Sequence, residues 1–164
     1  MNDLTELKVH IDGHVATLTM DSPPVNALTR VLNDELTLAL DRISEMDEIR
    51  VVVLTGAGKV FCAGADLKGR TANIKAPGDF QAHSRRTREC FHAIRECAKP
   101  VIVAINGAAL GSGLAMVASA DFLHQSTRLD LQIFVAAHDE QLEGTGQRAI
   151  FTQQVTPIIE HLHL

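Results

Sequence analysis

A chain of 164 residues has the length of one domain. Hydrophobic residues make up 46% and charged residues 21%, as in an ordinary globular protein that buries a sizeable core. The 15 basic and 20 acidic residues leave a net charge of −5, which argues against nucleic acid or an anionic membrane surface as the main partner. No signal-peptide layout and no bilayer-spanning apolar run is present, and the three cysteines form no C-x-x-C, so we expect a cytoplasmic protein.

The first elements that we expect are two short strands around a turn. In residues 7–11 and in residues 14–20, successive side chains alternate between two kinds, as on the two faces of a strand. The hairpin signal Asp12-Gly13 lies between these two segments. A helix follows, with Thr29 as its expected N-cap. Its apolar face comprises Leu32, Leu36, Ala39, Leu40 and Ile43, and its polar face comprises Asn33, Asp34, Asp41 and Arg42.

Helix and strand then alternate. Residues 51–54 and 101–105 are short apolar runs rich in β-branched residues, which is typical of strands buried on both faces of a parallel sheet. Residues 80–98 and 114–120 have the pattern of helices. With mostly short connections between them, these elements predict an α/β fold with βα crossover units.

Two glycine-rich loops each follow one of the doubly buried strands, at residues 56–68 and 106–115. Small residues leave backbone N–H groups free to donate, and the crevice beyond the carboxyl ends of parallel strands is the usual ligand site. A P-loop is excluded because Val60 follows Gly58-Lys59 where Ser or Thr is needed. A dinucleotide fingerprint is disfavoured because Met116 occupies the third glycine position.

Taken together, the two loops are far more specific than either alone. The motifs in order are Asn26-Ala-Leu, Phe61-Cys-Ala-Gly-Ala-Asp-Leu-Lys, Lys99-Pro-Val-Ile-Val-Ala-Ile-Asn-Gly, Leu110-Gly-Ser-Gly-Leu and Ala120-Asp. This series closely resembles the crotonase (enoyl-CoA hydratase/isomerase) superfamily over about residues 4–124. The resemblance implies a ClpP/crotonase-like spiral of ββα units, incomplete at the C-terminus, with a core at residues 1–124 and a divergent tail at residues 125–164.

The resemblance also implies a site for an acyl-CoA thioester, which is a substrate and not a cofactor. In the family, two backbone N–H groups point at the thioester carbonyl oxygen, and the matching positions here are Ala65 and Ser112. The family wraps CoA along the first loop, which corresponds to Ala63, Ala65, Asp66, Leu67 and Lys68, with Gly111 beside it in the second. A homo-oligomer, trimer or hexamer, is the family expectation, and no other cofactor or metal is implied.

The acid and base of the family's hydratases are missing at the expected positions. The first glutamate position is Ala115, and counting on to the second reaches Phe134-Val135, with no Pro-Glu. The tail offers Asp130, Asp139, Glu140 and Glu143, which we interpret as surface acids. Two readings follow: an enzyme of enolate chemistry, performing hydration or double-bond isomerisation, or an inactive truncated, alternatively spliced or frame-shifted fragment with a CoA-binding or assembly role.

The remaining polar residues have weaker interpretations. For Cys62 we favour a buried small hydrophobe over a reactive thiol, and we expect no zinc at His161 and His163. The cluster Arg85, Arg86 and Arg88 either meets CoA phosphates or, as we favour, forms a solvated helix face. We interpret Asp21 and Asp121 as turn or cap residues, and Lys68 as a candidate contact to the nucleotide end.

Overall fold

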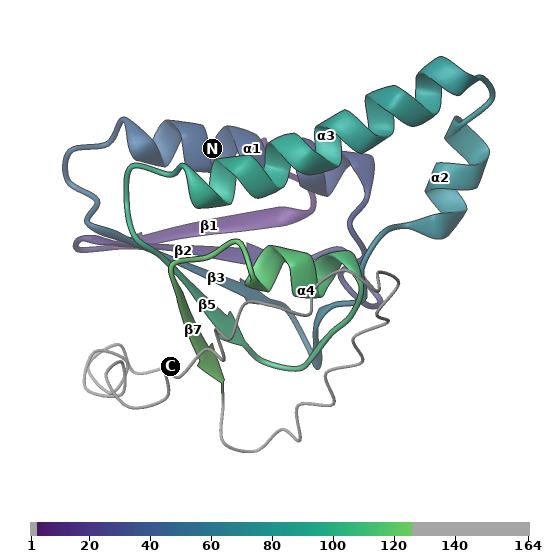
Figure 1. Ribbon diagram of the computed structural model, residues 1–164. Helices are drawn as coiled ribbons and strands as arrows, with labels where there is room; N and C mark the ends of the chain where they lie inside the picture. Colours follow the sequence, from purple (N-terminus) through teal and green to yellow (C-terminus); the bar gives the residue numbers. More distant parts are fainter. Residues whose placement is uncertain (1–2, 126–164) are drawn as a thin grey trace, which may run out of the picture.

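The computed structural model describes residues 3–125, in which strands alternate with helices (Figure 1). The elements in chain order are β1 (Leu7–Asp12), β2 (Val15–Met20), α1 (Arg30–Ser44), β3 (Val51–Gly56), β4 (Val60–Cys62), α2 (Leu67–Asn73), α3 (Pro77–Arg95), β5 (Val101–Ile105), β6 (Ala108–Ala109), α4 (Ser112–Val117) and β7 (Phe122–Gln125). The expected α/β class is confirmed. The expected tail at residues 125–164 lies, apart from Gln125, outside the described residues.

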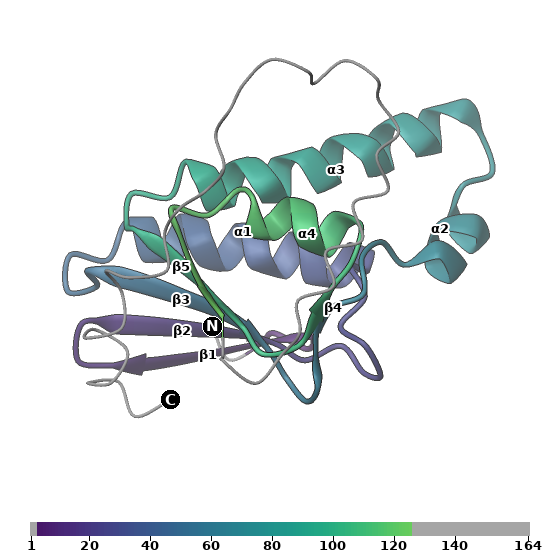
Figure 2. The same cartoon turned by 60° about the horizontal axis from the view of Figure 1, so that its bottom comes forward.

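A five-stranded sheet has the order β1-β2-β3-β5-β7. The hairpin partner β1 runs antiparallel to β2, and the remaining pairs are all parallel. Parallel neighbours need crossover connections, and α1, α3 and α4 supply them. Figures 1 and 2 place these three helices on the same side of the sheet, with α1 and α3 side by side. The carboxyl ends of β3 and β5 therefore lie at one edge, where each strand passes into a glycine-rich loop.

The core lies between this sheet and the helices on it. Along β2 the predicted alternation is confirmed, because Ala16, Leu18 and Met20 are fully buried while the residues between them are half-buried. The predicted apolar stripe of α1 is buried along its whole length. Thr29 is its N-cap as expected, since its hydroxyl oxygen accepts the N–H of Leu32 at 3.0 Å.

Several predicted details were wrong. Asn33, assigned to the polar face of α1, is 1% exposed, because its amide donates to the Thr29 carbonyl at 2.7 Å and so turns back along the helix. The helix predicted at 80–98 runs from Pro77 to Arg95, since the Asp79 carboxylate accepts the N–H groups just before it. The helix predicted at 114–120 spans Ser112–Val117.

The two aspartates interpreted as turn or cap residues fasten strands. The Asp121 carboxylate accepts the Val101 N–H at 2.8 Å, at the first residue of β5. Asp21 pairs with Lys8 across the β1–β2 hairpin. Asp121 therefore fixes the start of β5, as a capping group does at the end of a helix, whereas Asp21 forms a surface ion pair beside the end of β2.

A carboxylate of α1 holds the start of the described chain. The Glu35 side chain is 9% exposed and accepts three hydrogen bonds, from the Thr5 N–H (2.7 Å), the Thr5 hydroxyl (2.9 Å) and the Glu6 N–H (2.9 Å). Burial raises the pKa of this carboxyl, but the hydrogen bonds outweigh burial and lower the pKa below its ordinary value of 4.5. The ionised carboxylate thus joins α1 to the segment that leads into β1.

We predict that Glu35→Gln lowers the free energy of unfolding by about 1–3 kcal/mol at pH 7, because charge-assisted bonds are replaced by weaker ones. A folded-state pKa below the unfolded one stabilises the fold above the unfolded pKa, and that contribution disappears as the pH falls through the folded pKa. The difference between wild type and variant, measured by urea unfolding, should therefore shrink below about pH 4.5. A difference that stays constant down to pH 3 would contradict this assignment.

Candidate functional site

The two glycine-rich loops lie against each other. A small parallel sheet joins them, in which Val60 of β4 pairs with Ala108 of β6 and Cys62 pairs with Ala109. The Leu110 N–H then donates to the Cys62 carbonyl at 2.9 Å. Neither strand was predicted, because strands of three and two residues are too short for a periodic pattern.

Two glycines allow this contact. A Cβ on Gly64 would lie 2.7 Å from the Leu110 carbonyl oxygen and 3.3 Å from the Ser112 nitrogen. A Cβ on Gly113 would lie 2.5 Å from the Cys62 carbonyl oxygen. Gly64 also has a φ of 93°, which disfavours any other residue. Any side chain at these positions would force the loops apart.

The Ala65 N–H is held in a defined direction. On one side of Ala65 the Gly64 carbonyl accepts the Leu28 N–H at 2.8 Å, and on the other the Asp66 N–H donates to the Leu28 carbonyl at 3.3 Å. In extended backbone successive N–H groups point in opposite directions, so the Ala65 N–H points away from Leu28. Within residues 3–125 the Ala65 N–H has no hydrogen-bond acceptor.

The second predicted donor is at the start of α4. Ser112 is the first residue of this helix, and the carbonyl of its N-cap Gly111 accepts the Leu114 and Ala115 N–H groups. The Ser112 N–H, like that of Ala65, has no acceptor within the described part of the chain. Its nitrogen adjoins Gly64, the residue before Ala65. The fold therefore brings the two predicted positions together from distant parts of the sequence.

The residues expected to contact CoA follow one another along the first loop. The Ala63 N–H is used internally, donating to the Val25 carbonyl at 3.1 Å. Asp66 is the N-cap of α2, because its side chain accepts the Gly69 N–H at 3.0 Å. This role was not predicted, because the short helix that Asp66 precedes was not predicted either. Leu67 is 66% exposed, and Lys68 is also exposed. The first loop thus offers accessible apolar and cationic side chains next to Ala65.

The first position at which the resemblance implies a glutamate carries no carboxylate. Ala115 is exposed on α4, next to the second loop, and brings no ionisable group. Residues 134–135, together with the alternative acids and the two histidines expected not to bind zinc, lie outside the described residues. Among residues 3–125, no three histidine, cysteine or acidic side chains gather as a metal site would require.

A cavity of about 260 Å³ opens between the start of α1, α2 and the first half of α3. Its lining includes Leu28, which pairs with Ala65, and Asp66, the residue after Ala65. The rest of its wall is mainly charged or polar, and includes Arg30, Arg70, Asp79, His83 and Arg86. The volume is below the usual 300–1,000 Å³ of ligand pockets.

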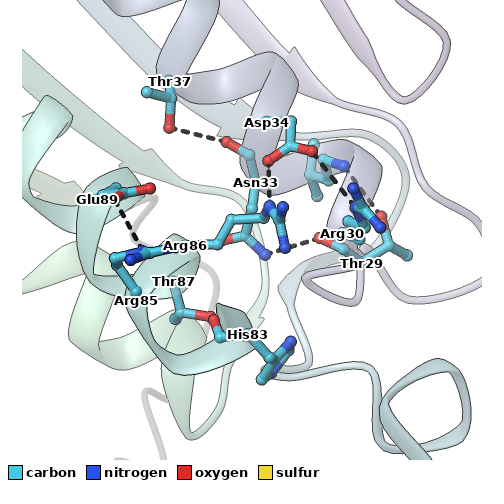
Figure 3. Close-up of polar contacts among 11 residues, drawn as sticks. Thr29, Arg30, Asn33, Asp34, Thr37, His83, Arg85, Arg86, Thr87 and Glu89 are labelled. Carbon is cyan, nitrogen blue, oxygen red and sulfur yellow. Dashed lines mark hydrogen bonds and ion pairs between the residues drawn. The ribbon is translucent and has the colours of Figure 1, made fainter. Parts of the chain in front are cut away.

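Two of the three arginines of α3 form ion pairs, each with a different carboxylate, as Figure 3 shows. Arg86, with 28% of its side chain exposed, reaches Asp34 of α1 at 2.7 Å, and Arg85 pairs with Glu89 on its own helix at 3.7 Å. Arg88 is exposed. The solvated-face interpretation therefore fits Arg85 and Arg88, whereas Arg86 fastens α3 to α1.

The comparisons with known proteins agree with this arrangement. The sequence model described as Enoyl-CoA hydratase/isomerase matches residues 10–153, so the chain belongs to this family. The chain is 39% identical over 112 residues to a probable enoyl-CoA hydratase, echA14, of Mycobacterium tuberculosis, covering 68% of this chain and 43% of that protein. It is 35% identical over 118 residues to the mitochondrial Delta(3,5)-Delta(2,4)-dienoyl-CoA isomerase of Pongo abelii, covering 66% of this chain and 36% of the isomerase.

Solved structures show the same fold. The DspI structure from Pseudomonas aeruginosa superposes with a TM-score of 0.71 at 32% identity, covering 77% of this chain and 51% of that one. The enoyl-CoA hydratase from Bacillus anthracis gives 0.69 at 35% identity, with 74% and 47% covered. The crotonase fold is thereby confirmed. The chain spans less than half the length of the curated relatives quoted above.

Within the described residues, no helix is both long and apolar enough to cross a membrane.

We predict that Gly113→Ala destabilises the fold by about 1–3 kcal/mol, because its Cβ would overlap the Cys62 carbonyl oxygen, 2.5 Å away. Urea unfolding measures the change. Gly78→Ala is the matched control, since a Cβ there meets nothing within 4 Å, and in a helix it should leave stability unchanged or slightly raised. Equal stability of both variants would contradict the close contact of the loops.

We predict that the native chain has one accessible thiol and two protected ones. Burial raises the pKa of the Cys62 thiol, against a smaller opposite effect of the Gly64 N–H, and burial raises the pKa of Cys90 to about 12. Cys97 is half-buried. At pH 8 a thiol reagent should label one cysteine rapidly, and Cys97→Ser should abolish that phase. Rapid labelling of Cys62 would overturn its interpretation as a buried hydrophobe.

Proposed function

We propose that this chain binds an acyl-CoA thioester and polarises its carbonyl with the Ala65 and Ser112 N–H groups. The observation that carries the proposal is that these two N–H groups, from loops in direct contact, are both without an acceptor in residues 3–125. Backbone N–H groups rarely stay unpaired within a fold unless another molecule or water accepts their hydrogen bonds. A carbonyl oxygen placed between them would accept both.

The chemistry follows from where the negative charge develops. When a proton leaves the carbon next to a thioester, or a nucleophile adds to its conjugated double bond, the carbonyl oxygen becomes an enolate oxygen. Fixed N–H donors stabilise that charge more than they stabilise the neutral carbonyl, which is how they accelerate the reaction. Each such donor contributes roughly 3–4 kcal/mol in comparable oxyanion sites. The reaction would be hydration or double-bond isomerisation of an enoyl-CoA.

The first loop would hold the CoA part of the substrate. Lys68 is exposed and offers a cation for a phosphate, and the exposed Leu67 offers an apolar surface beside it. The backbone around Ala63 and Asp66 would flank the pantetheine arm, with Gly111 on the opposite loop. These assignments follow the family motif, and the accessibility of both side chains supports them.

A second candidate is an inactive member that binds CoA or serves in assembly. The exposed Ala115 favours it, because hydratases of the family carry a carboxylate at this place. Proton transfer would then need a group from elsewhere. Loss of the conjugated thioester absorbance on adding an enoyl-CoA supports the enzyme, and binding without turnover supports the second candidate. A homo-oligomer and a cytoplasmic location remain parts of this proposal.

We predict that the purified chain binds a slowly reacting acyl-CoA thioester more tightly than free CoA, as measured by titration calorimetry. Ala65→Pro should remove this preference, because proline has no N–H, while the two bonds to Leu28 use the neighbouring residues. Where the wild type turns over an enoyl-CoA, Ala65→Pro should slow it by about 10²–10³-fold.

Ala65→Gly is the matched control for this experiment, since it keeps the N–H and should keep the preference. Thermal unfolding of both variants establishes that they fold. A folded Ala65→Pro chain that still prefers the thioester would refute the assignment of the Ala65 donor.

A further inference from the structure

Asn26 occupies an unusual place between β2 and α1. Its side chain is polar, yet the residue is 3% exposed, and its φ of 52° lies in the left-handed region. Asparagine tolerates this conformation better than most residues, but it still needs compensating contacts. The contacts that compensate for this conformation lie beside the candidate site.

The Asn26 side chain uses both ends of its amide. Its oxygen accepts the Ser22 N–H at 3.1 Å, within its own loop. Its nitrogen donates to the Ala57 carbonyl at 2.9 Å, just after β3, and to the Val60 carbonyl at 2.8 Å, at the first residue of β4. One side chain thus joins the loop after β2 to the beginning of the first glycine-rich loop.

The backbone next to Asn26 carries the Ala65 segment. Val25 and Leu28 make three hydrogen bonds to residues 63–66: Ala63 N–H to Val25 carbonyl (3.1 Å), Leu28 N–H to Gly64 carbonyl (2.8 Å) and Asp66 N–H to Leu28 carbonyl (3.3 Å). Asn26 fastens the middle of the segment that makes these bonds. The position of Asn26 therefore determines where Leu28 lies, and Leu28 in turn holds the residues on both sides of Ala65.

Other side chains fit this place poorly. A Cβ on Gly56 would lie 2.9 Å from the Asn26 amide nitrogen, so the amide is closely surrounded. Aspartate keeps the size but would turn a carboxylate toward two carbonyl oxygens. Glycine tolerates the backbone conformation but makes none of the three bonds. Glycine and aspartate therefore separate the role of the backbone from that of the two donated hydrogen bonds.

We propose that Asn26 is a positioning residue for the Ala65 N–H, setting its direction through the segment 25–28. This inference rests on the proposed function, because it gives Asn26 a role in polarising the thioester. Asn26 does not touch the substrate. Its loss should weaken recognition of the thioester carbonyl more than recognition of the rest of CoA, whereas a purely structural residue would affect both equally.

Two measurements on the full chain test the proposal, with the variants Asn26→Gly and Asn26→Asp. The first is amide hydrogen exchange by NMR. In both variants the Leu28 and Asp66 amides should exchange faster by about tenfold or more, while amides of β2 and β3 keep their protection. The second is the affinity ratio between a slowly reacting acyl-CoA thioester and free CoA, which should fall by about tenfold while the affinity for free CoA stays within about twofold.

Asn33→Ala is the matched control. Asn33 is also a buried asparagine with a side-chain bond to a backbone carbonyl, but its acceptor is Thr29, the N-cap of its own helix, and not the first glycine-rich loop. This variant should change neither the exchange of the two amides nor the affinity ratio.

The outcomes separate the two proposals. Unchanged exchange at Leu28 and Asp66 in both Asn26 variants overturns the positioning role, and so does a retained thioester preference with faster exchange. A wild-type chain without any thioester preference contradicts the proposed function instead, and the exchange data then decide whether Asn26 holds residues 63–66.

Discussion

The close contact between the two glycine-rich loops is the constraint on which the site depends. Gly64 and Gly113 leave room for the backbone of the opposite loop, and the short β4–β6 pair fixes how the loops meet. The rest of the fold places the two loops where they can meet. The crossover helices bring the carboxyl ends of β3 and β5 to one edge, so each loop starts from a largely buried strand in the middle of the sheet. Donors on rigid supports lose little free energy to reorganisation when charge develops.

Where burial follows a simple period, the sequence was sufficient to predict the fold. The alternation predicted for β2 is present in its burial, and the predicted apolar residues of α1 are buried, because each face meets a single environment. The prediction failed where tertiary contacts decide. The strands β4 and β6 exist only because the loops meet, and α3 begins early because the Asp79 carboxylate caps its first turn. Neither event leaves a periodic signal.

For the candidate site too, one part could be predicted from the sequence and another could not. The motif series indicated Ala65 and Ser112, and the structure places the segments that carry them next to each other. What supports Ala65 was not visible in the sequence. Leu28 lies in a different part of the chain, and Asn26 was only one residue of a motif, although asparagine in a loop is compatible with a left-handed turn. Side chains that act through another segment become visible only when that segment has been placed.

The proposed polarisation of the thioester and proton transfer therefore depend on different kinds of groups. The two donors are backbone groups, which survive substitution by any residue except proline, so a chain can keep them while its side chains change. Proton transfer depends on side-chain identity, and Ala115 supplies no acid or base. Membership of the family follows from the matching sequence and fold, whereas proton transfer depends on side chains that neither of these determines. A member with the donors alone would still bind the thioester and lower the free energy of its enolate, and an acid or base is what would convert this stabilisation into turnover.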